Sequence, residues 1–167
     1  DSNNNATTKN AINTGFIKAD GGQVYMTAGD ARRAVDSLVT NTGVIEAKSV
    51  SQKNGKIILS SSSGGGTATT LNHGTLNVSG QAAGETGGNI QILGDHVGAM
   101  ENSKTIATGS SGGGEILIGG DYQGTGSAQT AQRTYIDPAA LVDASATENG
   151  NGGENIRWGD DINRPHG

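Results

Sequence analysis

The feature that most constrains the fold of this chain is a short motif that recurs five times along its 167 residues. Each copy holds a glycine corner followed by two apolar residues that are separated by one other residue. Side chains alternate between the two faces of a strand, so this spacing predicts a strand with one buried face. The first apolar residues of the copies lie 33, 33, 26 and 40 residues apart, and they are Val24, Ile57, Ile90, Ile116 and Ile156. The fifth copy carries one added residue.

A second apolar pair falls between these copies, and asparagine stands four residues ahead of it in four of the five repeats. Asparagine and glycine tolerate positive φ and are typical of tight corners. A corner that recurs at one register predicts coils stacked on one another, with asparagine amides hydrogen-bonded in a ladder. The pairs are Ile17/Ala19, Ile45/Ala47, Leu76/Val78, Ile106/Thr108 and Val142/Ala144, and the expected ladder is Asn13, Asn41, Asn72 and Asn102. The fifth corner holds Pro138 instead and must turn differently.

A third short strand is expected in most repeats, around Leu38, Leu71, Val97 and residues 135–136. Three strands and three corners in about 30 residues predict an all-β protein, a right-handed parallel β-helix of about five coils. A propeller blade needs about four strands with aromatic signatures, and aromatic residues make up only 3% of this chain. A disordered, glycine-rich chain is disfavoured by the regular repeats. We expect a polar lead-in at 1–11, one domain at 12–161, and a frayed tail or truncated next coil at 162–167.

Composition excludes several classes of function. Cysteine is absent, which excludes disulfide scaffolds and cysteine zinc sites. The net charge of −5 opposes binding to nucleic acid, and no apolar run is long enough for insertion into a membrane.

Several runs resemble the two-partner-secretion exoproteins of the filamentous haemagglutinin type. They are GVIEA at 43–47, GGDYQG at 119–124, AQRTYI at 131–136 and GNGGENIRWGDD at 150–161. The resemblance implies a β-helical segment of a large adhesin, secreted or exposed on a bacterial surface, that leaves the cell unfolded through an outer-membrane secretion pore. The absence of cysteine suits this route, because an early disulfide would block threading. The resemblance further implies that this chain is a fragment of the long β-helical rod of such an adhesin and lacks the amino-terminal secretion domain.

Acidic residues follow the first motif in register. Asp95, Asp121 and Asp161 each lie five positions beyond the first apolar residue of their copy. A stacked row of carboxylates is a candidate Ca²⁺ site, but closure of each turn by its own aspartate is favoured, and no metal or cofactor is expected. The same carboxylates leave open the alternative of a carbohydrate-active β-helix enzyme, a polysaccharide hydrolase or lyase, which needs two suitably spaced acids.

The long excursion at 119–137 offers the best candidate contact surface, Tyr122, Arg133 and Tyr135, because variable loops on a rigid rod carry recognition. Packing of Tyr135 in the third strand is the favoured alternative for that residue. Trp158 stands in register with core residues and is expected to fill the last coil.

We therefore expect a non-enzymatic structural and adhesive segment that binds a host glycan or surface protein. Unpaired backbone groups at its ends predict end-to-end self-association.

Overall fold

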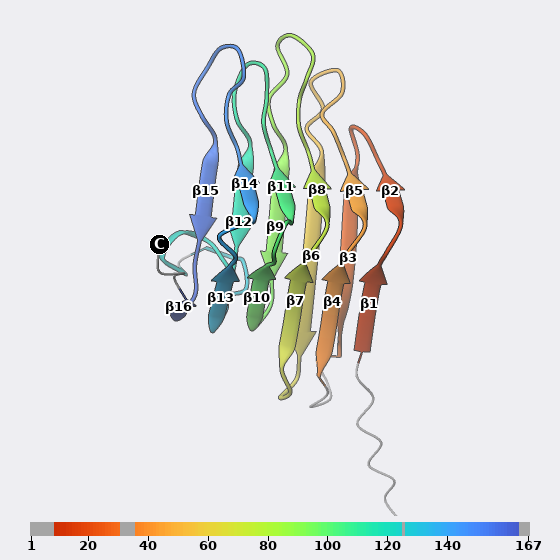
Figure 1. Ribbon diagram of the computed structural model, residues 1–167, viewed down its shortest axis with the longest axis vertical. Coiled ribbons are helices and arrows are strands. Elements are labelled where there is room, and N and C mark those ends of the chain that lie inside the picture. Colours follow the sequence, from red (N-terminus) through yellow and green to blue (C-terminus); the bar gives the residue numbers. More distant parts are fainter. Residues whose placement is uncertain (1–8, 31–35, 125, 164–167) are drawn as a thin grey trace, which may run out of the picture.

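Three short strands and three corners repeat along the chain, so that the backbone winds into stacked coils (Figure 1). The computed structural model describes residues 9–30, 36–124 and 126–163. Within them lie five complete coils and the first strand of a sixth, and all thirteen strand pairs are parallel. The predicted all-β, parallel β-helix is confirmed. No helix in the described ranges has the length and apolarity needed to cross a membrane.

The strands of each coil belong to three separate sheets. Sheet A holds the third predicted strand of each repeat, in the order β1 (Lys9–Asn13), β4 (Ser37–Asn41), β7 (Ala68–Asn72), β10 (His96–Ala99), β13 (Arg133–Ile136) and β16 (Asp161–Asn163). Sheet B holds the strand after the asparagine corner: β2 (Phe16–Lys18), β5 (Val44–Glu46), β8 (Thr75–Asn77), β11 (Lys104–Ile106) and β14 (Leu141–Asp143). Sheet C holds the strand after the glycine corner: β3 (Gln23–Asp30), β6 (Lys56–Ser63), β9 (Asn89–Leu93), β12 (Glu115–Ile118) and β15 (Glu154–Arg157).

The two ends of the chain differ from the expected domain limits. Strand β1 begins at Lys9, inside the range expected as a polar lead-in, and β16 lies across the expected start of the tail. Residues 1–8 of the lead-in and 164–167 of the tail lie outside the described residues.

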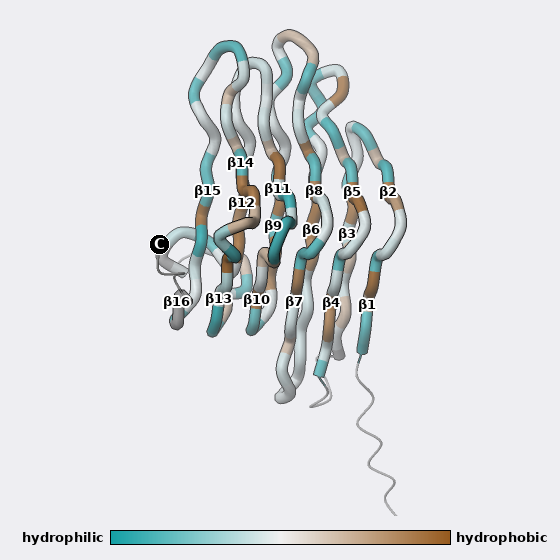
Figure 2. Tube along the Cα trace, in the orientation of Figure 1, coloured by the Kyte–Doolittle hydropathy of each residue, from teal (hydrophilic) through white to brown (hydrophobic). Residues whose placement is uncertain are grey.

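Identical positions of successive coils lie directly above one another in the core. Ile57 pairs in register with Ile90, which pairs with Ile116, and all three are fully buried. Burial of one such side chain contributes about 1.5–3 kcal/mol. Figure 2 shows the hydrophobic stretches on the strands and mostly hydrophilic residues in the loops. The core is therefore a set of aliphatic columns that run along the axis of the helix.

The fourth coil departs from the expected register in sheet B. Thr105, not Ile106, lies opposite Leu76 and Val142, and Thr105 and Ala107 are the fully buried pair. The inward positions that flank the corner are four residues apart in the first three coils and six apart in the fourth, from Ala99 to Thr105. The longer corner moves Ile106 to the outer face, where it is half-buried.

Trp158 also lies outside the position expected for it. Strand β15 stays in step with its glycine corner, so Asn155 lies opposite Ile116 and Arg157 lies opposite Ile118. The added residue of the fifth copy is not absorbed by a bulge, and Trp158 therefore does not continue the core column. It is half-buried, with its indole next to Gly124 of the short 3₁₀ helix η1 (Tyr122–Gly124).

A buried carboxylate joins two of the loops between sheets B and C. Glu85 accepts hydrogen bonds from the backbone N–H of Ala82 and of Ser51, each at 3.0 Å, although Ser51 belongs to the preceding coil. Ser51 has a φ of 51°, in the left-handed region that few non-glycine residues adopt. Glu85 therefore fixes its own turn and holds the loop beside it.

Candidate functional site

The asparagine ladder runs inside the coils, at the corner between sheets A and B. Asn13 Nδ2 donates to Asn41 Oδ1 at 2.8 Å, and Asn41 Nδ2 donates to Asn72 Oδ1 at 2.9 Å. Asn41 and Asn72 are fully buried, and Asn13 is 9% exposed. Buried amides need such partners, because an unpaired one costs about 1–3 kcal/mol. The ladder is therefore a structural element that fixes the stacking of the first three coils.

The fourth expected member, Asn102, is not part of this ladder. Ala99 occupies the position opposite Asn72, and Asn72 Nδ2 meets Thr105 Oγ1 instead, at 3.5 Å. Asn102 lies in the longer fourth corner, exposed and with a φ of 60°. Asn102 and Ile106 have the spacing of the motif, but neither lies opposite the motif residues of the preceding coil, Asn72 and Leu76.

Of the aspartates in the expected acidic row, Asp95 links neighbouring coils and Asp121 closes its own loop. Asp95 Oδ2 accepts a hydrogen bond from the N–H of Ala68 at 2.9 Å, and its Oδ1 accepts one from Gln129 Nε2 at 3.1 Å. Asp121 Oδ2 accepts one from the N–H of Ala128 at 3.1 Å. Asp161 begins β16, and its side chain is outside the described part of the structure. No cluster of three or more potential metal ligands occurs among the described residues.

The three residues of the expected contact surface differ in environment. Tyr122 is 64% exposed in η1, and Arg133 is exposed at the start of β13. Tyr135 is half-buried within β13, and its hydroxyl donates to Asp137 Oδ2 at 2.9 Å. That hydrogen bond, with some burial and the negative charges of Asp137 and Glu101, raises the pKa of Tyr135.

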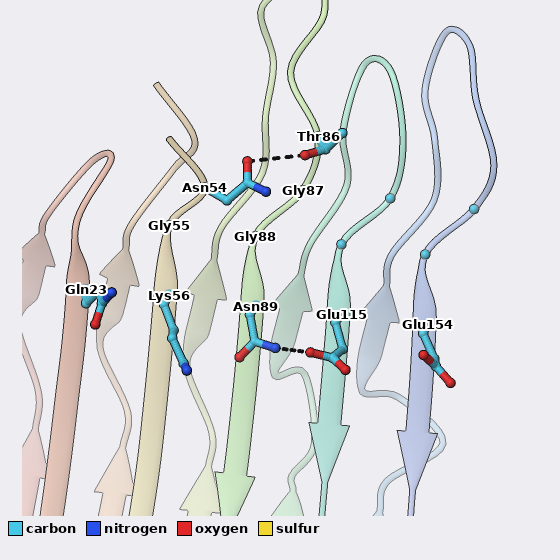
Figure 3. Close-up of a pocket in the computed structure, with 14 residues that line it drawn as sticks. Gln23, Asn54, Gly55, Lys56, Thr86, Gly87, Gly88, Asn89, Glu115 and Glu154 are labelled. Atoms are coloured by element: carbon cyan, nitrogen blue, oxygen red, sulfur yellow. Dashed lines mark hydrogen bonds between the residues drawn. The ribbon is translucent and has the colours of Figure 1, made fainter. Parts of the chain in front are cut away.

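A groove on the outer face of sheet C is a site that sequence reasoning missed. It has a volume of about 640 Å³ and is lined by residues of all five complete coils. Pairing in register places one residue from each coil in a single row along it (Figure 3). This groove row is Gln23, Lys56, Asn89, Glu115 and Glu154.

The side chains of the row are polar and partly linked. Asn89 Nδ2 donates to Glu115 Oε2, whereas Asn89 Oδ1 is buried without a hydrogen-bond partner. Above the row, Thr86 Oγ1 donates to Asn54 Oδ1 at 3.2 Å and forms a wall of the groove. The row offers both donors and acceptors to a ligand.

Glycines form the upper part of the groove because the coils approach closely there. A Cβ at Gly88 would lie 2.1 Å from the carbonyl oxygen of Gly55, and one at Gly114 would lie 2.1 Å from that of Gly88. No side chain fits between the coils at these positions. Backbone therefore lines this part of the groove. The sequence held a signal for this row. In the first four copies of the glycine motif, the row residue immediately precedes the first apolar residue.

Comparison with known proteins agrees with the fold. The crystal structure of the HMW1 secretion domain from Haemophilus influenzae matches with a TM-score of 0.70 over 94% of this chain, at 24% sequence identity. The match covers 46% of that chain, and at this identity it shows a shared fold. The matching structure is a secretion domain, the part that the sequence analysis expected this chain to lack.

A curated sequence shares a shorter stretch. The Heme/hemopexin-binding protein of Haemophilus influenzae is 52% identical over 48 residues, which are 29% of this chain and 5% of that protein. No family model matches the chain. The chain thus corresponds to less than half of the solved domain and to a small part of the curated protein.

Proposed function

We propose that this chain is a non-enzymatic β-helical segment of a bacterial exoprotein of the two-partner-secretion type, exported through an outer-membrane pore partner. The observation that carries the proposal is the in-register stack of five coils, which shares its fold with a secretion domain over 94% of the chain. The local identity of 52% to a Haemophilus protein and the haemagglutinin-like runs add sequence support. The absence of cysteine suits export of an unfolded chain, because no disulfide can form before threading.

The fold also suits export in physical terms. Each new coil can pair with the coil before it, because every strand from β4 to β16 hydrogen-bonds to its counterpart in the preceding coil. A chain that emerges gradually from a pore can therefore fold outside the cell one coil at a time. Because the likeness is to a secretion domain, we extend the proposal to recognition by the pore itself.

A secretion assay tests this proposal. The chain is fused to a reporter enzyme and expressed, with an export signal, in bacteria that carry or lack the outer-membrane transporter for the HMW1 protein. We expect reporter activity in the medium only when the transporter is present, and in the periplasm when it is absent. Equal activity in the medium of both strains contradicts the proposal. The reporter without the chain is the matched control.

A more specific proposal is an adhesive role for the surface formed by Tyr122, Arg133 and Tyr135. We propose that this surface contacts a host glycan or surface protein, supported by the exposure of Tyr122 at 64%. A glycan array probed with this chain and with the double variant Tyr122→Ala, Tyr135→Ala tests it. We expect the variant to lose the signals, and unchanged signals contradict this role.

A further inference from the structure

The groove over sheet C points to a ligand that lies along the axis of the β-helix. Its lining comes from five successive coils, so an occupant meets the same kind of position once per coil. Parallel strands lie about 4.8 Å apart, and the groove row therefore repeats its polar groups at about that interval. A compact ligand would use one or two of these positions, whereas a linear polymer would use all of them.

We propose that this groove binds an uncharged, linear oligosaccharide, with about one sugar unit per coil. A β-1,4-linked pyranose ring in an extended chain advances by about the spacing between coils, and alternate rings face opposite ways, so the same hydroxyl groups meet the row again at about every second coil. An extended polypeptide advances by about 3.3 Å per residue, and its side chains on one face repeat at about twice that length. A peptide therefore falls out of phase with the row within a few coils.

The chemistry of the row also selects hydroxyl groups, which both donate and accept hydrogen bonds. Lys56 donates only, and the carboxylate of Glu154 accepts only. Gln23 and Asn89 each carry an amide, which both donates and accepts hydrogen bonds. Gly152 and Gly153 are exposed in the groove lining and place no side chain between a sugar ring and the backbone.

Charge decides between neutral and anionic sugars. The row carries one cation, Lys56, against the carboxylates of Glu115 and Glu154, and the whole chain has a net charge of −5. A sulfated or uronic acid polymer would place its negative groups beside these carboxylates and be repelled. The ligand class is therefore neutral. This inference goes beyond the proposed function, and groove binding and secretion can fail independently.

The test is titration of the purified chain with neutral β-1,4-linked oligosaccharides of two to six sugars, built from glucose, xylose or N-acetylglucosamine, followed by NMR chemical shifts. We expect affinity to rise with length up to about five sugars, as successive coils are engaged. Shifts are expected at the groove row and its glycines. Failure of every oligosaccharide to bind at millimolar concentration overturns the proposal, as does binding only by sulfated sugars or by extended peptides.

A blocking variant locates the site without disturbing the fold. Gly152 lines the groove, and a Cβ at this position meets no atom within 4 Å. Gly152→Leu should therefore fold and weaken the binding of the six-sugar probe at least tenfold. Gly15→Leu is the matched control, because a Cβ there also meets nothing within 4 Å and Gly15 lies outside the groove. Equal affinity of the two variants overturns the proposal, and so does loss of binding in Tyr122→Ala.

Discussion

Replacement of Asn41 by alanine tests the buried ladder where it is most fully connected. Asn41 is fully buried, accepts from Asn13 at 2.8 Å and donates to Asn72 at 2.9 Å. Each bond contributes about 1 kcal/mol net, and a buried polar group left without a partner costs about 1–3 kcal/mol more. Asn72 Oδ1 retains a bond from the N–H of Gly74 at 3.2 Å, and Asn13 Nδ2 retains one to the carbonyl oxygen of Gly15 at 3.3 Å, so neither neighbour is left wholly unpaired. Asn41→Ala also removes the bond from Asn41 Nδ2 to the carbonyl oxygen of Gly43 at 3.2 Å, and we expect the loss of the three bonds to lower the free energy of unfolding by about 2–4 kcal/mol.

Urea denaturation followed by far-ultraviolet circular dichroism measures this loss. A loss of that size lowers the unfolding midpoint by more than about 1 M urea at an unchanged slope. Asn102→Gly is the matched control, because Asn102 is exposed and its φ of 60° suits glycine. Its effect should stay within about 0.5 kcal/mol. Equal losses in the two variants, or a loss below about 1 kcal/mol in Asn41→Ala, would refute the reasoning.

Three further predictions follow from single contacts. Gly88→Ala should strongly reduce the free energy of unfolding in the same assay, because its Cβ would lie 2.1 Å from a backbone oxygen of the neighbouring coil, whereas Gly15→Ala meets no atom and should fold as stably as the parent chain. Glu85→Gln should lower the free energy of unfolding by about 1–2 kcal/mol in urea denaturation, since an amide keeps only one of the two acceptor oxygens that hold the loops. An unchanged free energy of unfolding contradicts this role of Glu85. The raised pKa of Tyr135 predicts that its tyrosinate absorbance appears at higher pH than that of an ordinary tyrosine and shifts down in Asp137→Asn. The folded state then holds this proton more tightly than the unfolded state, so stability should fall as pH rises from the ordinary tyrosine pKa to the raised pKa of Tyr135. An absorbance curve unchanged by Asp137→Asn contradicts the assignment.

The sequence predicted the winding of the chain because each coil repeats its own signals. The Gly-x-aliphatic motif marks sheet C in the first four coils and, with one added residue, in the fifth, and Leu38, Leu71 and Val97 lie in sheet A as expected. These signals are local and periodic, and the period of a strand is two residues. The stacking that follows from them is equally regular.

Prediction of the core-facing residues from the sequence was wrong where a corner changed length or a strand shifted by one residue. Asn102 and Ile106 have the spacing of the ladder motif, but the longer corner of the fourth coil gives their expected places to Ala99 and Thr105. Trp158 was misplaced because the added residue was expected to be absorbed before Ile156. A shift of one residue exchanges the two faces of a strand, and only the pairing with the neighbouring coil decides it. The groove depends on such pairing across five coils, which a scan for catalytic motifs does not reveal.

Cysteine cross-linking between β5 and β8 tests the central claim, that successive coils lie parallel and in register. The chain has no cysteine of its own, so two introduced thiols give an unambiguous signal. Glu46 pairs with Asn77 across these strands, and Val44 pairs with Thr75. Under mild oxidation the pair Glu46→Cys, Asn77→Cys should form a disulfide, because residues in register lie about 5 Å apart. The pair Val44→Cys, Asn77→Cys lies on a diagonal of about 7–8 Å and should stay reduced. Preferential cross-linking of Val44→Cys with Asn77→Cys, the pairing that antiparallel strands would give, would contradict the account.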